Sequence, residues 1–262
     1  MNHSDRNNEL PVNTNTVPTN WKQLFQQHCT HNIKKVQAHT FLDAYGTSTG
    51  AVRVDCDDGN SYVIKPNNLR STIAEQVIGR LGAMIKAPVG EVVLVDVPSE
   101  LIENHDDEMA GFNPGITHGC RFVSRCIPAI NKVQYIHTAN RPRYAKLAFL
   151  YGWTVANDHQ FCFEIPGYLV HSFDHGEFFP NGPQWNEESL LSCASVSIDK
   201  LIAEACRFDE SDLNQAKPSL NDITEIIVAN IIANVPGDWR ITLEEKVALA
   251  NFLLYRCIEL RR

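Results

Sequence analysis

The 262-residue chain lacks the features that mark several large classes of protein. No apolar run approaches the roughly 20 residues that a membrane-spanning helix needs, and the polar N-terminus is unlike a secretory signal peptide. The formal net charge of −8 gives no support to binding of a nucleic-acid phosphate backbone. No internal repeat is visible, and no low-complexity tract occurs beyond the N-terminus. We therefore expect a cytoplasmic protein that contacts neither nucleic acid nor membrane.

Paired cysteines are also missing. The chain has 8 cysteines, but none of them forms a Cys-x-x-Cys pair, and most lie among apolar residues. Zinc fingers and ribbons depend on such closely spaced thiolates, so the spacing argues against a structural zinc site. We expect reduced thiols, as is usual inside the cell.

What the sequence does contain begins with a polar tail. Residues 1–20 are rich in Asn, Ser, Thr and Pro without periodicity, which predicts disorder. Residues 21–29 favour a short helix. Alternating apolar residues then predict strands at 35–41, 51–54, 61–65 and 91–97, with a hairpin turn at Asp58-Gly59-Asn60. A helix is expected at 71–85 with Ser71 as its N-cap, so this part predicts a small antiparallel sheet with one helix.

A loop of small residues separates the first two strands. It contains Gly46, Thr47, Ser48, Thr49 and Gly50. Glycine admits backbone dihedrals that other residues avoid, so the amides of such a loop can close over phosphate oxygens. An ordinary hairpin loop is the alternative, because this pattern taken alone is weak.

A lysine and a glutamate follow this loop. Lys65 ends the third strand, and Glu75 lies one turn into the following helix. An ion pair between a strand lysine and a helix glutamate directs the lysine towards the phosphates in kinase-type sites. The structural alternatives are a lysine that reaches to water and a first-turn acid that favours the helix dipole.

Two aspartates flank a predicted hairpin farther along. Asp158 follows a mostly buried helix at 140–153, and Asp174 follows an apolar strand at 168–170. Phosphoryl transfer needs such a pair: one carboxylate orients the attacking hydroxyl and the other holds magnesium. Aspartates that only cap turns are the alternative. Beyond Trp185 the pattern predicts helices at 189–196, 197–208, 223–235 and 243–260.

Taken in order, these segments resemble the HipA-like kinase domain, a bacterial group distantly related to HipA toxin kinases and phosphatidylinositol 3-/4-kinases. The resemblance runs from about His39 to Trp185. It is carried by the segments YGTSTGAVRVDCDDGNSYVIKPNN, AEQVIGRLGAMIKAPVGEVVLVDV, GITHGCRFV, WTVANDHQ and VHSFDHGEFF.

The resemblance implies an α+β, two-lobed protein-kinase-like fold with a small antiparallel-sheet N-lobe and a mostly helical C-lobe. The expected divisions are a tail and short helix at 1–32, the N-lobe at 33–128 and the C-lobe at 129–262. It also implies transfer of the γ-phosphate of ATP, with Mg²⁺, to an unidentified hydroxyl acceptor. HipA-type kinases suggest a protein serine or threonine, and the phosphoinositide relatives suggest a small molecule.

Site residues follow from the same resemblance. It places the nucleotide at residues 46–50, Lys65 and Glu75, and the adenine at Ser124, Arg125, Cys126 and Ile127, on a strand expected at 121–127. Asp158 and Lys65 would be catalytic, and Asp174 would bind metal. His118 and Arg121 are candidates for phosphate or substrate contacts, with a structural polar role as the alternative for either.

The sequence departs from the family after Asp158, where related kinases carry a metal-binding asparagine. Gln160 or Asn157 would have to supply that oxygen, since amide carbonyls can bind magnesium. A catalytically weak or inactive pseudokinase that acts as an interaction module is therefore an alternative. A third reading, a protein without a nucleotide site, requires Lys65 and Asp174 to lie far apart.

Overall fold

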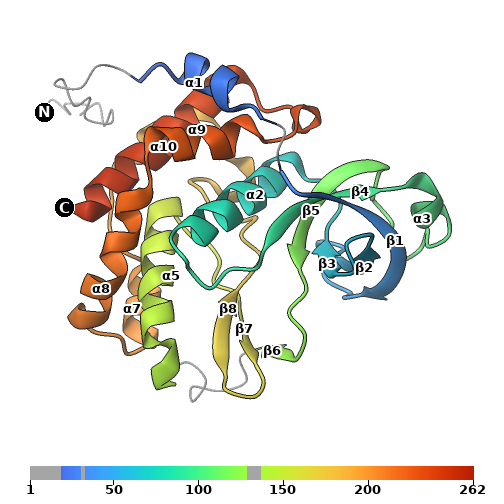
Figure 1. Cartoon of the computed structure of the whole chain (residues 1–262), viewed down its shortest axis with the longest axis horizontal. Coiled ribbons are helices and arrows are strands. Elements are labelled where there is room, and N and C mark those ends of the chain that lie inside the picture. Colours follow the sequence, from blue (N-terminus) through green and yellow to red (C-terminus); the bar gives the residue numbers. More distant parts are fainter. Residues whose placement is uncertain (1–18, 31–32, 129–136) are drawn as a thin grey trace, which may run out of the picture.

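The first part of the molecule is a closed β-barrel (Figure 1). The computed structural model describes residues 19–30, 33–128 and 137–262. Of the tail predicted at 1–20, residues 1–18 lie outside the described part, and Asn20 is the N-cap of α1 (Trp21–His28). The barrel has the strand order β1-β2-β3-β5-β4. Its strands are β1 (Lys35–Ala44), β2 (Val52–Cys56), β3 (Ser61–Ile64), β4 (Val92–Val97) and β5 (Gly115–Arg121).

The barrel corrects one expectation, because its sheet is mixed rather than wholly antiparallel. β1 runs parallel to β4, whereas the β1–β2, β2–β3, β3–β5 and β4–β5 pairs are antiparallel. A parallel pair needs a long crossover, and β2, β3 and α2 (Leu69–Met84) supply it here. Alternate residues of β2 and β4 fill the barrel interior, which accounts for the period-2 pattern in the sequence.

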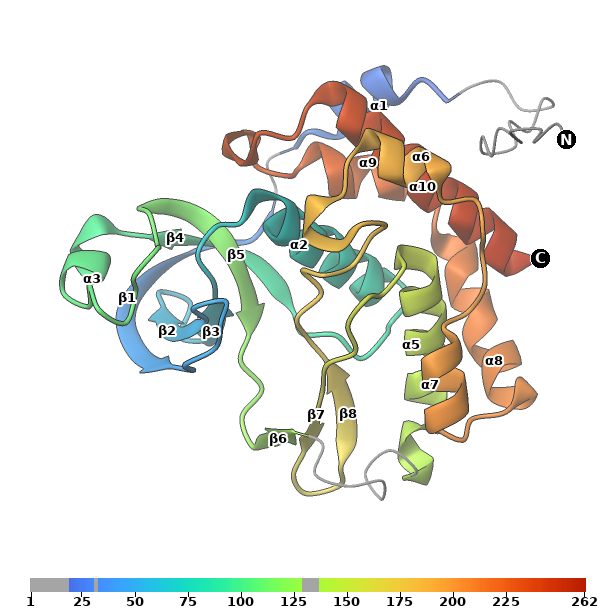
Figure 2. The same cartoon turned by 180° about the vertical axis from the view of Figure 1, so that it is seen from behind.

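Helix α2 lies between the barrel and the helical part of the chain (Figures 1 and 2). It begins at Leu69, so the prediction that Ser71 caps it was wrong. Asn68 occupies the N-cap position, and its side chain makes no capping hydrogen bond. A glycine lets α2 approach β4 of the barrel closely. A Cβ added at Gly79 would lie 2.4 Å from Cγ1 of Val92, which no packed side chain tolerates.

A second sheet connects the barrel to the helices. Its order is β6-β7-β8, with β6 (Cys126–Pro128), β7 (Phe161–Glu164) and β8 (Leu169–Ser172). The predicted hairpin between Asp158 and Asp174 is therefore confirmed. The strand expected at 121–127 was wrong, because β5 ends at Arg121 and β6 starts only at Cys126. Arg125 has a φ of 59°, which interrupts extended backbone between them.

The C-terminal part is helical, as expected. α5 (Arg141–Thr154) matches the predicted buried helix, with Pro142 in its first turn. Helix α8 (Glu210–Ala216) was missed, although Asp209 and Asp212 form its capping box. α1 packs on α9 (Glu225–Ala233) and α10 (Leu243–Arg261), where Trp21 donates a 2.6 Å hydrogen bond to Asn251. The other helices of the described residues are α3 (Ser99–Glu103), α6 (Glu187–Ser192) and α7 (Lys200–Ala205), with 3-10 turns η1 (Thr138–Asn140), η2 (Gly182–Gln184), η3 (Lys217–Asp222) and η4 (Gly237–Trp239).

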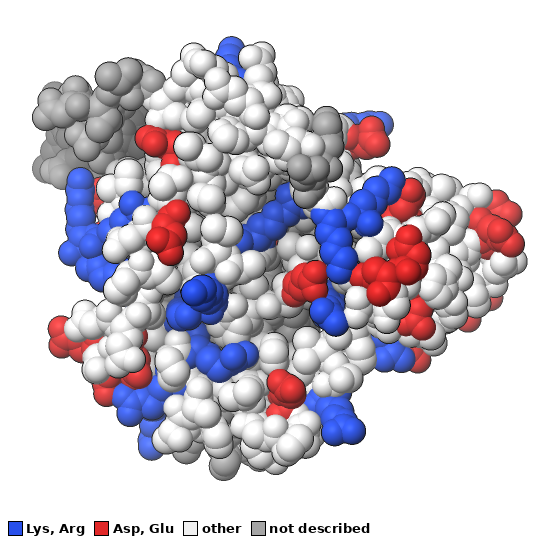
Figure 3. Space-filling view, viewed as in Figure 1, with Lys and Arg blue, Asp and Glu red and all other residues white. Residues whose placement is uncertain are grey.

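The protein is thus a mixed α/β chain with a sheet-rich N-terminal region and a helical C-terminal region. Its charge is unevenly spread. Figure 3 shows acidic side chains concentrated on the barrel end of this face, while basic side chains gather nearer its middle. Within the described ranges, no helix combines the length and the apolar character that crossing a bilayer requires.

Glycine 152 fixes how closely α5 meets the segment before α7. A Cβ at this position would lie 2.1 Å from the carbonyl oxygen of Ser197. Alanine normally stabilises a helix interior by about 1 kcal/mol relative to glycine. Here the clash is with backbone, so we expect Gly152→Ala to lower the free energy of unfolding by ~1–3 kcal/mol. Urea denaturation measures the effect. Gly237→Ala, whose Cβ meets nothing within 4 Å, is the control and should change stability little.

Candidate active site

Three charged residues from distant parts of the chain meet between the barrel and the helical region. Lys65 follows β3, and its Nζ lies 2.9 Å from Oε1 of Glu75 on α2. Nζ also forms an ion pair with Asp174, which follows β8. The predicted ion pair between Lys65 and Glu75 is therefore present. The direct contact with Asp174 contradicts the reading that required Lys65 and Asp174 to lie far apart.

Glu75 is 5 % exposed, so its charge depends on its partners. Burial alone would raise the pKa of this carboxyl, but its charged and hydrogen-bonding partners, Lys65 foremost, together outweigh burial and lower the pKa to about 2. The other carboxylate oxygen, Oε2, accepts a 3.0 Å hydrogen bond from the backbone N–H of His175. Glu75 is thus an ionised, buried group that ties α2 to the segment after β8.

The pKa of Asp174 shifts in the opposite direction to that of Glu75. Burial raises the pKa of its carboxyl, and nearby Glu75 adds to the rise, although Lys65 pulls it back. Burial would lower the pKa of Lys65, but the two carboxylates together hold it above the usual value. One positive charge therefore serves two carboxylates. The cluster carries an unbalanced negative charge, and a further cation beside Asp174 would relieve it.

Gln160 joins the two aspartates. Its Nε2 donates hydrogen bonds to Oδ2 of Asp158, at 2.7 Å, and to Oδ2 of Asp174, at 3.1 Å. The other carboxylate oxygen of Asp158 accepts from the N–H of His159 at 2.8 Å. The amide therefore stands where the two carboxylates converge. Asn157, the other candidate for the missing amide, turns away and donates to the carbonyls of Glu177 and Phe179.

A cavity of about 420 Å³ opens beside this cluster. Six predicted nucleotide or metal residues line it: Ser48, Thr49, Gly50, Lys65, Glu75 and Asp174. Gly46 and Thr47 belong to the same loop but not to the cavity wall. Asp158 and Gln160 are also outside the wall and reach it through the hydrogen bond to Asp174.

The glycine loop is a tight turn that needs its glycines. Gly46 and Gly50 have φ values of 60° and 64°, in the left-handed region that glycine adopts without strain. The N–H of Gly50 donates to the carbonyl of Thr47 at 3.0 Å. A Cβ at Gly50 would lie 3.3 Å from Cγ of Pro66, so the loop packs closely on the segment after Lys65.

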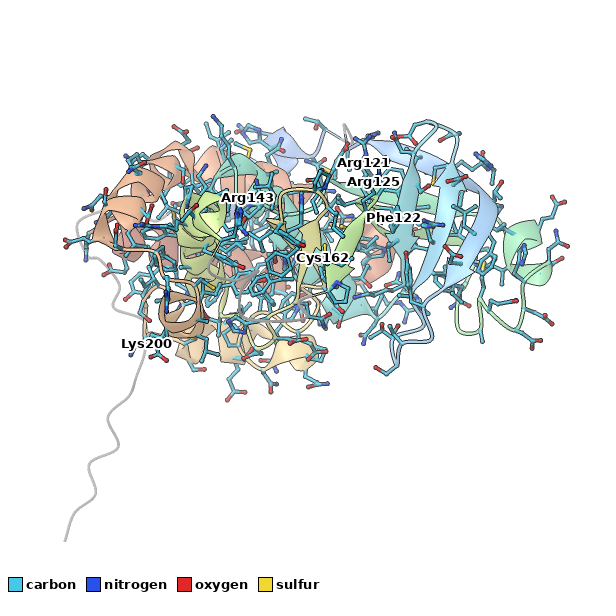
Figure 4. All side chains as sticks on the ribbon, turned by 90° about the horizontal axis from the view of Figure 1, so that it is seen from below. Arg121, Phe122, Arg125, Arg143, Cys162 and Lys200 are labelled. Atoms are coloured by element: carbon cyan, nitrogen blue, oxygen red, sulfur yellow. The ribbon has the colours of Figure 1, made fainter. Side chains whose placement is uncertain are left out.

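The predicted adenine residues lie elsewhere. Ser124 and Arg125 form the turn after β5, and Cys126 and Ile127 belong to β6. None of the four lines the cavity. Figure 4 shows Arg121, Phe122 and Arg125 near one another, on the connection that leads from the barrel to the sheet holding Cys162. The structure therefore places these residues where the two regions join, separate from the charged cluster.

The cavity wall also contains His118, which the sequence offered as a phosphate or substrate contact, and eight residues that were not predicted as site residues. These eight are Pro66, Asn67, Asn68, Ser71, Thr72, Ala110, Gly176 and Glu177. Several belong to the start of α2, which the sequence marked only as a helix boundary. The polar run Asn67-Asn68 before an apolar helix was the available signal. His118 is buried, and burial lowers its pKa to about 4, so the ring is neutral at pH 7.

Comparison with known proteins was made on sequence and on structure. Residues 44–162 match the family model of the HipA-like kinase. The crystal structure of the Helicobacter pylori proinflammatory kinase CtkA is similar with a TM-score of 0.54 at 13% identity, covering 84% of this chain and 91% of that one. This likeness shows a shared fold.

A second similar structure, the Golgi casein kinase with bound Mn and ADP, has a TM-score of 0.49 at 11% identity, over 92% of this chain and 75% of that one. A search of curated proteins finds no match. The sequence resemblance is nevertheless confirmed, because residues 44–162 are matched by the HipA-like kinase family.

Proposed function

We propose that the protein is an ATP-dependent kinase that transfers the γ-phosphate of ATP to a hydroxyl acceptor, with a protein serine or threonine as the substrate. One observation carries the proposal: Lys65 contacts both Glu75 and Asp174 at the wall of a cavity that the glycine loop also lines. Residues 33–128 would form the N-lobe and residues 129–262 the C-lobe, with the nucleotide between them. Ser124 to Ile127 would contact the adenine.

Each residue has a distinct part in this reaction. Lys65, held by Glu75, would bind phosphate oxygens and neutralise their charge. Asp158 would accept a hydrogen bond from the acceptor hydroxyl and orient it towards the γ-phosphate. The glycine-loop amides would close over the phosphates and exclude water. Catalysis would come from positioning and charge neutralisation, without a covalent enzyme intermediate.

The residues present fit Mg²⁺, which would supply charge neutralisation at the phosphates. Asp174 provides a carboxylate oxygen of the kind that magnesium prefers. Gln160 would add an amide oxygen once its amide turned over, because its Nε2 now donates to both aspartates. The cluster also carries more negative charge than Lys65 balances. No group of three or more His, Cys, Asp or Glu side chains within the described part could hold a metal. Two protein ligands are usual for magnesium that is shared with a nucleotide.

The test has two stages. Thermal unfolding is followed with ATP, with and without Mg²⁺, and transfer of labelled phosphate is then measured on the protein itself and on a mixed serine and threonine peptide library. The proposal expects stabilisation by MgATP and labelled product. It fails if MgATP neither binds nor stabilises the protein.

A non-catalytic nucleotide-binding module is the second candidate. The hydrogen bond from Gln160 occupies Oδ2 of Asp158, and the usual asparagine is absent from this loop. If the protein is such a module, MgATP should stabilise it, but no acceptor should become labelled. The thermal unfolding and labelling experiments therefore separate the two candidates.

Gln160 tests the metal part of the proposal. We expect Gln160→Ala to raise the Mg²⁺ concentration needed for half-maximal stabilisation by ATP by ~10-fold, the lower end of the usual loss on removing a supporting metal-site group. Gln160→Glu should lower it, since it adds a negative charge between two carboxylates. Gln23→Ala, on the exposed face of α1, is the control. An unchanged Mg²⁺ dependence in both Gln160 variants would remove this residue from the metal site.

A further inference from the structure

The first turn of α2 faces the cavity with hydrogen-bond donors that the protein does not use. The backbone N–H groups of Leu69, Arg70 and Ser71 have no acceptor within the described residues. The N–H of Thr72 is the first that donates within the turn, to the carbonyl of Asn68. A helix of 16 residues also concentrates a partial positive charge at this end. An uncapped start of this kind favours an anion.

The direction of this helix start is fixed by its packing. Asn68, Ser71 and Thr72 all belong to the cavity wall. A Cβ at Gly176 would lie 3.0 Å from Cβ of Ser71 and 3.6 Å from Oε1 of Glu75. Ser71 and Glu75, one turn apart, therefore lie on the same face of α2 towards the segment after Asp174. Of the three residues with free N–H groups, Ser71 lines the same cavity as Lys65.

A second, independent donor in the cavity wall is the ring of His118, on β5. Arg80 can only donate, and its Nη2 donates to Oε1 of Gln76 at 2.6 Å. This orients the Gln76 amide so that Nε2 donates to the carbonyl of Val93, at 2.6 Å, and to Nδ1 of His118, at 3.0 Å. Nδ1 is therefore an acceptor, and the proton of the neutral ring lies on Nε2.

That proton has no acceptor in the described part of the chain. His118 is 5 % exposed and lines the cavity, and its Nε2 makes no hydrogen bond there. The nearest carboxylate oxygen, Oε2 of Glu75, is 3.8 Å away, beyond hydrogen-bond length. A buried donor without an acceptor costs stability unless a ligand satisfies it. Two donors, the N–H groups at the start of α2 and Nε2 of His118, therefore lack an acceptor in the described part of the chain.

The ionised groups of the wall decide what kind of anion fits. Lys65 faces the carboxylates of Glu75 and Asp174, and Glu177 adds another acid at the rim. A free anion would meet this excess of negative charge. An anion that arrives with a divalent cation would not, because the cation balances the carboxylates while the helix start supplies donors.

We propose that the first turn of α2, with the hydroxyl of Ser71 and Nε2 of His118 behind it, forms a subsite for a phosphate group in the magnesium-loaded cleft. The inference rests on the proposed function, since it requires nucleotide and metal in the same cavity. The phosphate could be the terminal phosphate of ATP or an anionic group on the acceptor. In the second case the enzyme would prefer acceptors that already carry a phosphate.

Asn68→Asp tests the subsite without harming the helix. An aspartate at the N-cap accepts hydrogen bonds from the free N–H groups and complements the helix dipole, so the unliganded protein should unfold at the same or a higher temperature. The same carboxylate blocks the donors and repels phosphate. Asn68→Ser caps without charge and should weaken binding less. Asn186→Asp makes the same change at the N-cap of α6, away from the cavity, and is the matched control.

Three probes distinguish the sources of the phosphate by calorimetry: MgADP, MgATP, and inorganic phosphate added to protein saturated with MgADP. If Asn68→Asp binds MgATP ~10-fold or more weakly while its affinity for MgADP is unchanged, the subsite belongs to the terminal phosphate. Repulsion by an added carboxylate within a few ångströms is large enough to cause a loss of affinity of this size. A loss confined to inorganic phosphate assigns it to the acceptor.

The inference is overturned if wild-type protein binds MgADP while Asn68→Asp binds all three probes as the control does. In that outcome the proposed function survives. If the wild-type protein binds neither nucleotide, the proposed function fails and takes this inference with it.

Discussion

Asp174→Asn is expected to abolish most phosphate transfer while leaving the fold intact. The substitution removes the carboxylate that would hold magnesium and keeps the shape of the side chain. Loss of a group that stabilises charge in the transition state typically lowers kcat by ~10²–10³-fold. ATP should still bind, but its stabilising effect should no longer depend on Mg²⁺.

The Asp174→Asn protein should lose activity but should not lose stability. The raised pKa of Asp174 means that its folded form binds a proton more tightly than the unfolded form. Its ionisation therefore weakens the fold above that pKa, and the weakening disappears as pH falls through it. A neutral asparagine removes this effect, so Asp174→Asn should unfold at the same or a higher temperature at pH 7. Urea denaturation between pH 4 and 8 measures the change.

Asp107→Asn, on an exposed turn, is the matched control and should change neither activity nor stability. An Asp174→Asn protein that is folded, fully active and still dependent on Mg²⁺ would remove Asp174 from the proposed metal site.

The strands of the barrel could be predicted because each presents one buried face. Val52, Val54 and Cys56 are buried and alternate with partly exposed residues, and the turn at Gly59 joins them to β3. This is local information. The parallel pairing of β1 with β4 is not local, because it depends on where a chain returns after α2, and no residue pattern in either strand specifies a partner.

Local sequence likewise predicts one part of the candidate site and not the other. The glycine loop, Lys65 and Asp174 have recognisable neighbours in the sequence, so their order suggested a cleft. The contact between Lys65 and Asp174 joins residues 109 positions apart and forms only when the fold brings the end of β3 beside the segment after β8. The sequence offered His118 as a phosphate contact, but it could not show that the ring proton of His118 or the N–H groups at the start of α2 would lack an acceptor. Whether a polar group is satisfied depends on its final neighbours, which only the folded chain defines.

One arrangement explains both the stability and the proposed activity of the site. A buried glutamate holds Lys65 in place, and the peptide N–H of His175 holds the same glutamate from the other side. His175 also contacts the hydroxyl of Ser172, at 2.8 Å, beside Tyr151. The charged cluster is therefore anchored in the core of the helical region. Changing its charge should affect folding as well as chemistry.

Lys65→Met should show this double effect most strongly. The variant keeps the length of the side chain but leaves two carboxylates in a poorly solvated place without a counter-charge. Breaking a buried ion pair by removing one partner costs ~3–5 kcal/mol. We therefore expect a loss of stability of that size at pH 7, together with a fall in activity of at least ~100-fold from the lost phosphate contact.

The pH dependence identifies the cause. In the wild-type protein the lowered pKa of Glu75 contributes stability that is fully present above the unfolded pKa of about 4.5 and is lost as pH falls towards about 2. Without Lys65, burial raises the pKa of Glu75 and Asp174, so both take up protons as the solution is acidified. The stability difference between wild type and Lys65→Met should therefore shrink between pH 7 and pH 4.

Lys65→Arg is the matched variant for this experiment. It keeps the positive charge between Glu75 and Asp174, but its planar, forked head does not reproduce the compact ammonium. It should recover most of the stability at pH 7 and little of the activity, which separates the structural part of Lys65 from its part in phosphate binding. A Lys65→Met protein whose deficit in stability is the same at pH 7 and pH 4 would show that the two carboxylates do not depend on Lys65 for their charge.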